Sequence, residues 1–166
     1  MTGSNRSRRV TKERIKPAWW GELYPRWYDL ERLAEDYGCL VIMSHGRVPG
    51  FFPGNEEAAP AIFIPVKAGT LDRFWYLAHE LGHMILHLGP RGDMLYSKDE
   101  VQANIWAAET LIPRARIHLY GNACEDAFIG ALSAHYEDLP LEDCPARRLA
   151  ARIASIRLHS LSLEVA

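Results

Sequence analysis

The residue types best suited to chemistry lie in the stretch HELGH at residues 79–83, inside the apolar run WYLAHELGHMILHLGP at residues 75–90. On a helix, His79 and His83 lie one turn apart and about 40° apart around the axis, so both imidazoles project from one face. Two neutral imidazoles in this arrangement bind one Zn²⁺ through nitrogens at about 2.0–2.1 Å, as in H-E-x-x-H sites. Glu80 lies beside the two histidines and can act on a water molecule as a general base. The stretch therefore predicts a catalytic zinc site.

A catalytic zinc ion usually takes three protein ligands and keeps a further position for water. His87 continues the four-residue series of His79 and His83. However, His87 would lie about 12 Å from His79 along a helix axis, because each residue adds 1.5 Å. We therefore exclude His87 as a ligand of the same ion and expect the third ligand in another segment.

Carboxylates of the following segment, SKDEVQANIWAAETLIP, are the candidates for the third ligand. Glu100 and Asn104 share one helical face, whereas Glu109 points about 180° away from Glu100. Asn104 can also hold a ligand histidine through a hydrogen bond, which favours the face of Glu100. The prediction is a site of two histidines and Glu100, with Glu109 and Asp99 as alternatives to Glu100.

The elements that position these residues follow from hydrophobic spacing and from turn residues. Between the first two strands, a Gly- and Pro-rich connection holds a short extended piece at residues 51–52. The order of helix, strands and helices predicts one α+β domain, in which a short mixed or antiparallel sheet packs on the HELGH helix. The predicted helices cover residues 27–37, 71–88, 97–112, 123–136 and 145–159, and the predicted strands cover residues 39–43 and 61–66.

Pro65 lies near the end of the predicted strand AIFIPV and has no amide proton to donate. We therefore expect this end of the strand at a sheet edge or beyond its ladder of hydrogen bonds. An exposed edge of AIFIP could hold an extended peptide substrate.

Composition and charge fit one folded domain with a basic arm. The 166 residues are 48% hydrophobic and 24% charged, without an apolar run long enough to span a bilayer. Residues 1–16 hold six Lys or Arg and one Glu, although the whole chain has a net charge of −2. We expect a flexible N-terminal arm at residues 1–16 and a single metallopeptidase-like domain at residues 17–166. We do not expect the arm to bind nucleic acid directly.

The chain has three cysteines, an odd number, and no CxxC pair. A thiolate zinc site or a disulfide framework is therefore not expected. No secretory signal is visible at the N-terminus, since the basic segment is followed by PAWWGELYPRW and not by an apolar region. These features together predict a reducing, cytoplasmic location.

Two segments together resemble a known family. LAHELGHMILH, followed by EVQANIWAAETLIP, is similar to the ImmA/IrrE family of zinc-dependent peptidases. Members of that family pair an H-E-L-G-H helix with a later helix that reads E-x-E-A-N-x-F-A-A-x-L-L-M-P. The resemblance extends from about Trp27 to Pro113. The chain departs from the family pattern at Gln102, Trp106 and Thr110, none of which is a proposed ligand.

The resemblance implies a small zincin-like fold of the gluzincin type and a zinc-dependent metalloendopeptidase. It implies His79 and His83 as ligands, Glu80 as the base and Glu100 as the third ligand. It also implies a protein partner, a helix-turn-helix repressor whose cleavage derepresses genes of mobile elements or of stress responses.

Two other functions compete with this hypothesis. One is a metal-binding regulatory module without turnover, which would bind a repressor or DNA through the basic arm. The other is DNA binding through the Arg-rich segment at residues 145–159. The second is weaker, because the arginines spread around that predicted helix and do not form one stripe.

Overall fold

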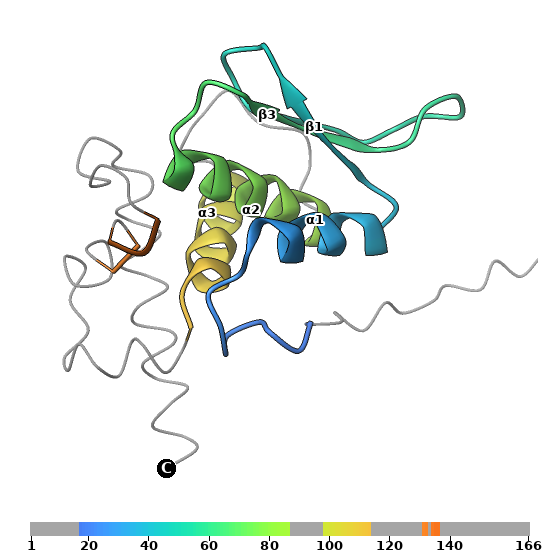
Figure 1. The fold of residues 1–166 in the computed structure, drawn as a ribbon. Helices are drawn as coiled ribbons and strands as arrows, with labels where there is room; N and C mark the ends of the chain where they lie inside the picture. The colour runs from blue at the N-terminus through green and yellow to red at the C-terminus, as the bar shows by residue number, and fades with distance from the viewer. Residues whose placement is uncertain (1–16, 87–97, 114–130, 133, 137–166) are drawn as a thin grey trace, which may run out of the picture.

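The computed structural model describes residues 17–86, 98–113, 131–132 and 134–136 (Figure 1). The predicted arm at residues 1–16 and the predicted helix at residues 145–159 lie outside the described residues, as do His87, Cys124 and Cys144. Of the predicted helix at residues 123–136, the described residues 131–132 and 134–136 are helical.

Three short strands form one mixed sheet in the order β1-β3-β2. They are β1 (Leu40–Ser44), β2 (Gly50–Phe52) and β3 (Ala61–Pro65). β1 runs parallel to β3, and β2 runs antiparallel to β3. The predicted strands are therefore present, and the short extended piece expected at residues 51–52 is β2.

The prediction that AIFIP offers an edge to a substrate is wrong, because β3 is the central strand and pairs on both sides. Pro65 is the last residue of β3 and lies opposite Ser44 of β1. Pairing with β2 ends at Phe63, opposite Gly50, so Pro65 lies beyond the ladder on that side. A proline is tolerated here because the β2 side requires no amide proton from it.

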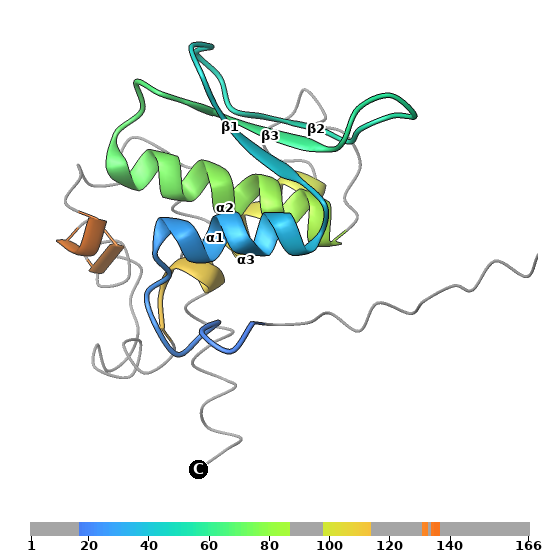
Figure 2. The same cartoon turned by 45° about the vertical axis from the view of Figure 1, so that its right-hand side comes forward.

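The described helices include α1 (Trp27–Asp36), α2 (Thr70–Leu86) and α3 (Lys98–Leu111). Figures 1 and 2 show the strands as one layer over the helices, with α2 directly beneath them and between α1 and α3. Among the described helices and strands, α2 and α3 make the most extensive contact. The fold is thus α+β with a small mixed sheet packed on the HELGH helix, as the sequence predicted.

The core forms where the apolar side of α2 meets the sheet and the neighbouring helices. Most apolar side chains on this side of α2 are buried, and Phe74 is partly buried. Burying such a stripe supplies the main driving force for holding α2 in place. The core residues that α2, β3 and α1 contribute include Leu77, Ala78, Leu81, Ile85, Ile62, Ile64, Leu30 and Leu33.

Both ends of α1 are determined by local chemistry. The Asp29 carboxylate accepts hydrogen bonds from the Arg26 backbone amide at 2.8 Å and from the Arg26 guanidinium at 3.1 Å. These bonds satisfy an amide that no carbonyl within the helix can reach. At the other end, Gly38 has a φ of +72°, a conformation that glycine adopts without strain. The chain then turns directly into β1.

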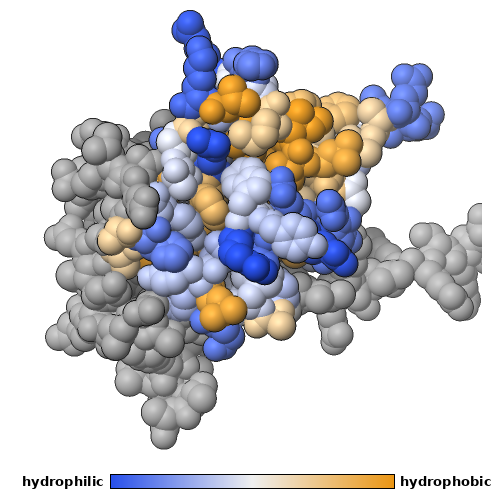
Figure 3. All heavy atoms as spheres, in the orientation of Figure 1, coloured by the Kyte–Doolittle hydropathy of each residue, from blue (hydrophilic) through white to orange (hydrophobic). Residues whose placement is uncertain are grey.

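Several large apolar side chains remain exposed on the edge strand β1 and the loop after it. Figure 3 shows the corresponding apolar surface over the strands. The residues are Leu40, Ile42, Met43 and Val48. No helix in the described part of the chain is long and apolar enough to cross a membrane.

Candidate metal centre

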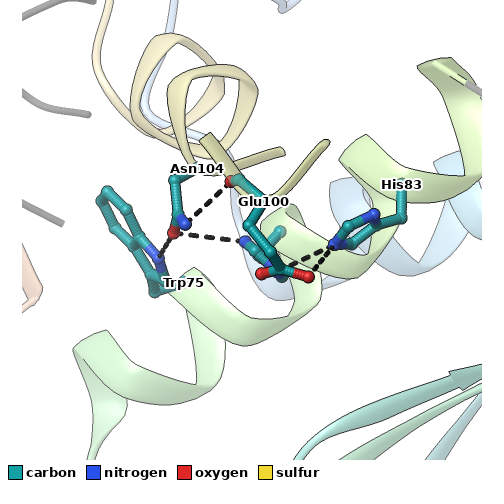
Figure 4. Close-up of polar contacts among 5 residues, drawn as sticks. Trp75, His83, Glu100 and Asn104 are labelled. Atoms are coloured by element: carbon teal, nitrogen blue, oxygen red, sulfur yellow. Dashed lines mark hydrogen bonds and ion pairs between the residues drawn. The ribbon is translucent and has the colours of Figure 1, made fainter. Parts of the chain in front are cut away.

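His79 and His83 of α2 meet Glu100 of α3 in a buried group. The Nε2 atoms of the two imidazoles are 3.1 Å apart. One Glu100 oxygen, Oε2, lies 3.2 Å from His79 Nε2, and the other, Oε1, lies 3.1 Å from His83 Nε2. Figure 4 shows the carboxylate between its own helix and the ring of His83. Two successive helices thus direct three ligand-type atoms at one point.

The distances within this group fit a tetrahedral zinc site. Ligand atoms at about 2.0–2.2 Å from a tetrahedral ion are about 3.3–3.6 Å apart, close to the 3.1–3.2 Å between these atoms. Two imidazole nitrogens and one carboxylate are also a known donor set of catalytic zinc. Each of the three side chains is at most 6% exposed. The residues present therefore fit the ion that the sequence predicted.

The charge on Glu100 is favoured by its two partners. Burial raises the pKa of the Glu100 carboxyl, but the adjacent imidazoles of His79 and His83 lower it by more. The pKa consequently lies below its usual range, and the group is a carboxylate at neutral pH. A buried anion between two imidazoles is an arrangement that a cation would stabilise further.

Asn104 holds His79 from behind, as the sequence predicted for a ligand histidine. Its side-chain oxygen Oδ1 lies 3.2 Å from His79 Nδ1 and accepts a hydrogen bond from the indole N–H of Trp75 at 3.1 Å (Figure 4). Its side-chain nitrogen Nδ2 donates to the backbone carbonyl of Glu100 at 2.9 Å. One amide therefore links the α2 histidine to the α3 residue that supplies the carboxylate.

The other carboxylates considered from the sequence are not members of this group. Glu80 is buried next to His79 on α2 and is not one of the three clustered residues. On α3, Asp99 is half-buried and Glu109 is buried, and neither belongs to the cluster found among the described residues. Glu100 is therefore the carboxylate that the structure brings to both histidines.

Gly82 permits the close approach of α3. A Cβ atom built on Gly82 would lie 3.1 Å from the carbonyl oxygen of Ala103 and 3.2 Å from its Cα. It would also lie 3.4 Å from Trp106 Cβ. Since Ala103 lies between Glu100 and Asn104 in the sequence, this contact determines how near both residues come to α2. The sequence alone did not identify Gly82 as a residue of this contact.

Trp75 was also missed as a residue of the site. It precedes His79 by four positions, as His79 precedes His83, so the three side chains share one face of α2. That spacing was visible in the sequence. The partner of Trp75 was not, because Asn104 belongs to another helix.

Comparison with known families supports the assignment made from the residues. The model of the family Peptidase_M78, described as the IrrE N-terminal-like domain, matches residues 34–123. The match covers more than half of the chain and contains the whole of β1, β2, β3, α2 and α3. This chain belongs to the Peptidase_M78 family. The resemblance to ImmA/IrrE peptidases is thereby confirmed.

The chain therefore belongs to a family of peptidases. Independently of the family match, His79, His83 and Glu100 form a group that can hold a metal ion. The search of curated proteins and the search of solved structures found no match.

Proposed function

We propose that this chain is a zinc-dependent endopeptidase whose metal is bound by His79, His83 and Glu100. The observation that supports this most directly is the convergence of three buried donor atoms within 4.8 Å of one another. The chain's place in a peptidase family supplies the reaction class. The three side chains are buried, so the Glu100 carboxylate is removed from water. A buried charge requires a partner, and a metal cation would provide one.

Glu80 is the proposed general base. When bound, a zinc ion supplies a Lewis acid that polarises the scissile carbonyl and lowers the pKa of the attacking water. The Glu80 carboxylate accepts a proton from this water as the water oxygen bonds to the carbonyl carbon. Glu80 then passes that proton to the amine nitrogen as the C–N bond breaks. Glu80 thus both accepts and returns the transferred proton, and it is not one of the proposed metal ligands.

The positioning of the ligands comes from the two helices. His79 is held by Asn104, and the Glu100 carboxylate lies against both imidazoles. Ligand atoms held in this way need little rearrangement to bind an ion, which favours tight binding.

The proposed substrate is a helix-turn-helix transcriptional repressor, and its cleavage would derepress mobile-element or stress genes. The resemblance to ImmA/IrrE peptidases supports this choice. We also propose that residues 17–166 form one metallopeptidase domain, that residues 1–16 form a basic arm, and that the protein acts in the cytoplasm.

Metal analysis and a cleavage assay test this function together. We expect the wild-type protein to bind one zinc ion and to cleave a candidate helix-turn-helix repressor supplied as substrate. Glu80→Gln should retain the zinc and lose at least about 100-fold in cleavage rate, as expected for removal of a general base. Asp99→Asn, outside the cluster, is the control and should behave as wild type.

Three outcomes would contradict the proposal. Undiminished cleavage by Glu80→Gln would exclude Glu80 as the base. Zinc retained after His79 and His83 are both replaced by alanine would place the metal elsewhere. A wild-type protein that binds zinc and the repressor without cleaving it would be the regulatory module without turnover.

A further inference from the structure

Trp75 lies on the same face of α2 as the two histidines, one turn before His79. It is among the largest fully buried side chains of the described structure. Its indole N–H donates to Asn104 Oδ1 at 3.1 Å, the same oxygen that lies 3.2 Å from His79 Nδ1. Trp75 thus reaches the proposed metal centre through one intermediate residue.

Trp75 determines which way the Asn104 amide faces. An indole nitrogen only donates hydrogen bonds, and a backbone carbonyl only accepts them. Asn104 contacts one of each, because Oδ1 accepts from Trp75 and Nδ2 donates to the Glu100 carbonyl at 2.9 Å. A flipped amide would place two donors together on one side and two acceptors together on the other. Only the observed orientation satisfies both neighbours.

This orientation in turn determines the tautomer of His79. Because Asn104 presents an oxygen to His79 Nδ1, a hydrogen bond forms only when Nδ1 bears the proton. In the neutral imidazole, the lone pair is then on Nε2, the atom that faces His83 and Glu100. Nε2 with a free lone pair is the state that binds a metal ion.

We infer that Trp75 is a positioning residue, whose indole N–H fixes the Asn104 amide and thereby holds His79 in its metal-binding tautomer. The Trp75 indole N–H is donated to Asn104, so its effect on His79 passes through that amide. The inference rests on the proposed metal centre, but it does not depend on peptidase activity.

The two histidines differ in this respect. His83 Nδ1 is buried and has no hydrogen-bond partner among the residues that the structure describes. No described residue therefore selects a tautomer for His83 from behind, whereas His79 is held by the Trp75–Asn104 pair. Substitutions at Trp75 should accordingly change the tautomer of His79 and not that of His83.

Trp20 provides a matched control. Its indole N–H also donates to a buried side-chain oxygen of α3, Thr110 Oγ1, and the distance is again 3.1 Å. Thr110 lies ten positions after Glu100, about 15 Å along the helix axis. Trp20→Phe and Trp75→Phe therefore remove equivalent hydrogen bonds, and only the second acts on Asn104.

The experiment compares zinc affinity and the His79 tautomer in these proteins. Zinc affinity is measured by competition with a chromophoric chelator, and tautomers are read from long-range ¹H–¹⁵N spectra of the metal-free proteins at a pH where imidazole is neutral. A second variant replaces Trp75 with benzothienylalanine, which keeps the ring shape but has sulfur in place of the N–H. This variant preserves the test if Trp75→Phe does not fold.

We expect His79 of the wild-type protein to bear its proton on Nδ1. Both Trp75 variants should show a mixture of His79 tautomers and bind zinc about fivefold more weakly, the change equivalent to one neutral hydrogen bond. Trp20→Phe should keep the wild-type tautomer and stay within about twofold of wild-type affinity. In an Asn104→Ala background, Trp75→Phe should have no further effect on zinc affinity.

A wild-type His79 protonated on Nε2 would overturn the inference. So would Trp75 variants that keep both the tautomer and the affinity, or a Trp20→Phe variant that weakens zinc binding equally. If the wild-type protein takes up no zinc, the proposed metal centre fails. The tautomer of the metal-free protein then still decides whether Trp75 positions His79.

Discussion

Replacing Gly82 with alanine tests whether close packing of α2 on α3 positions the metal ligands. The added Cβ would lie 3.1 Å from the Ala103 carbonyl oxygen and 3.2 Å from Ala103 Cα, while ordinary contacts begin at 3.4 Å. Both atoms belong to the backbone and cannot rotate away. α3 must therefore move about 0.3 Å away from α2 at Ala103 to restore an ordinary contact. Glu100 and Asn104, on either side of Ala103, would move with it.

Two effects on stability oppose each other in Gly82→Ala. Alanine is favoured over glycine inside a helix by about 1 kcal/mol. Overpacking a well-packed interface costs about 1–3 kcal/mol. The net expectation is a loss of about 0–2 kcal/mol in the free energy of unfolding, small enough for the variant to fold.

The effect on zinc binding should be larger. Zinc–ligand distances tolerate deviations of about 0.2 Å, and the expected retreat of α3 is greater than that. We therefore expect zinc affinity to fall roughly 10- to 100-fold, the range found when the outer support of a ligand is lost. Unfolding in urea gives the stability, and competition with a chelator gives the affinity.

Gly50→Ala is the control, since a Cβ on Gly50 would meet nothing within 4 Å. Its zinc affinity should equal that of the wild type. The reasoning would be refuted by a Gly82→Ala protein that is about 1 kcal/mol more stable than wild type and binds zinc as tightly. Such a result would mean that α3 has room to spare at this contact.

Three further predictions concern single side chains. Glu100→Gln should weaken zinc binding by more than about 100-fold, beyond the range for an outer-shell partner, whereas Asp99→Asn should leave the affinity in the chelator assay unchanged. Asp29 has a lowered pKa because of its hydrogen bond with Arg26, so its contribution to stability is present above the unfolded pKa of about 3.9 and is lost as the pH falls through the folded value. Urea unfolding should therefore separate Asp29→Asn from wild type at pH 7 and not at pH 2. Burial raises the pKa of Cys39 from 9.0 to about 11, so its stabilising effect is present below pH 9 and lost as the pH rises through 11. Mass spectrometry should show iodoacetamide modifying Cys39 at pH 8 about 100-fold more slowly in the folded protein than in urea, and an equal rate would contradict its burial.

The features that sequence reasoning predicted well are those set within one element. The spacing of His79 and His83 is a property of a single helix, so their convergence follows from helical geometry alone. Glu100 required one more step, the choice of a face on α3. The structure brings Glu100 to both histidines, and Asn104, on the same face, contacts His79.

The features that sequence reasoning missed depend on which elements become neighbours. Pro65 predicted a sheet edge or a place beyond the ladder, and the structure has the second, because β3 pairs on both sides and its pairing with β2 ends at Phe63. The expectation that AIFIP offers an open edge was wrong for the same reason. Gly82 and Trp75 have visible positions on α2, but their roles arise from Ala103 and Asn104 on another helix. Residue spacing indicates the face of a helix and does not identify the partner that faces it.

The departure from the family pattern at Thr110 is also explained by a contact between two segments. Thr110 stands where the family pattern has an aliphatic residue, and its side chain is fully buried. A buried hydroxyl destabilises a protein unless it is hydrogen-bonded, and Thr110 Oγ1 accepts the indole N–H of Trp20. The polar residue on α3 is therefore matched by a donor ninety positions earlier in the chain. Trp20 and Trp75 use the same chemistry on the same helix, so α3 is held to the rest of the domain by two indole hydrogen bonds, and one of these also reaches the proposed metal centre.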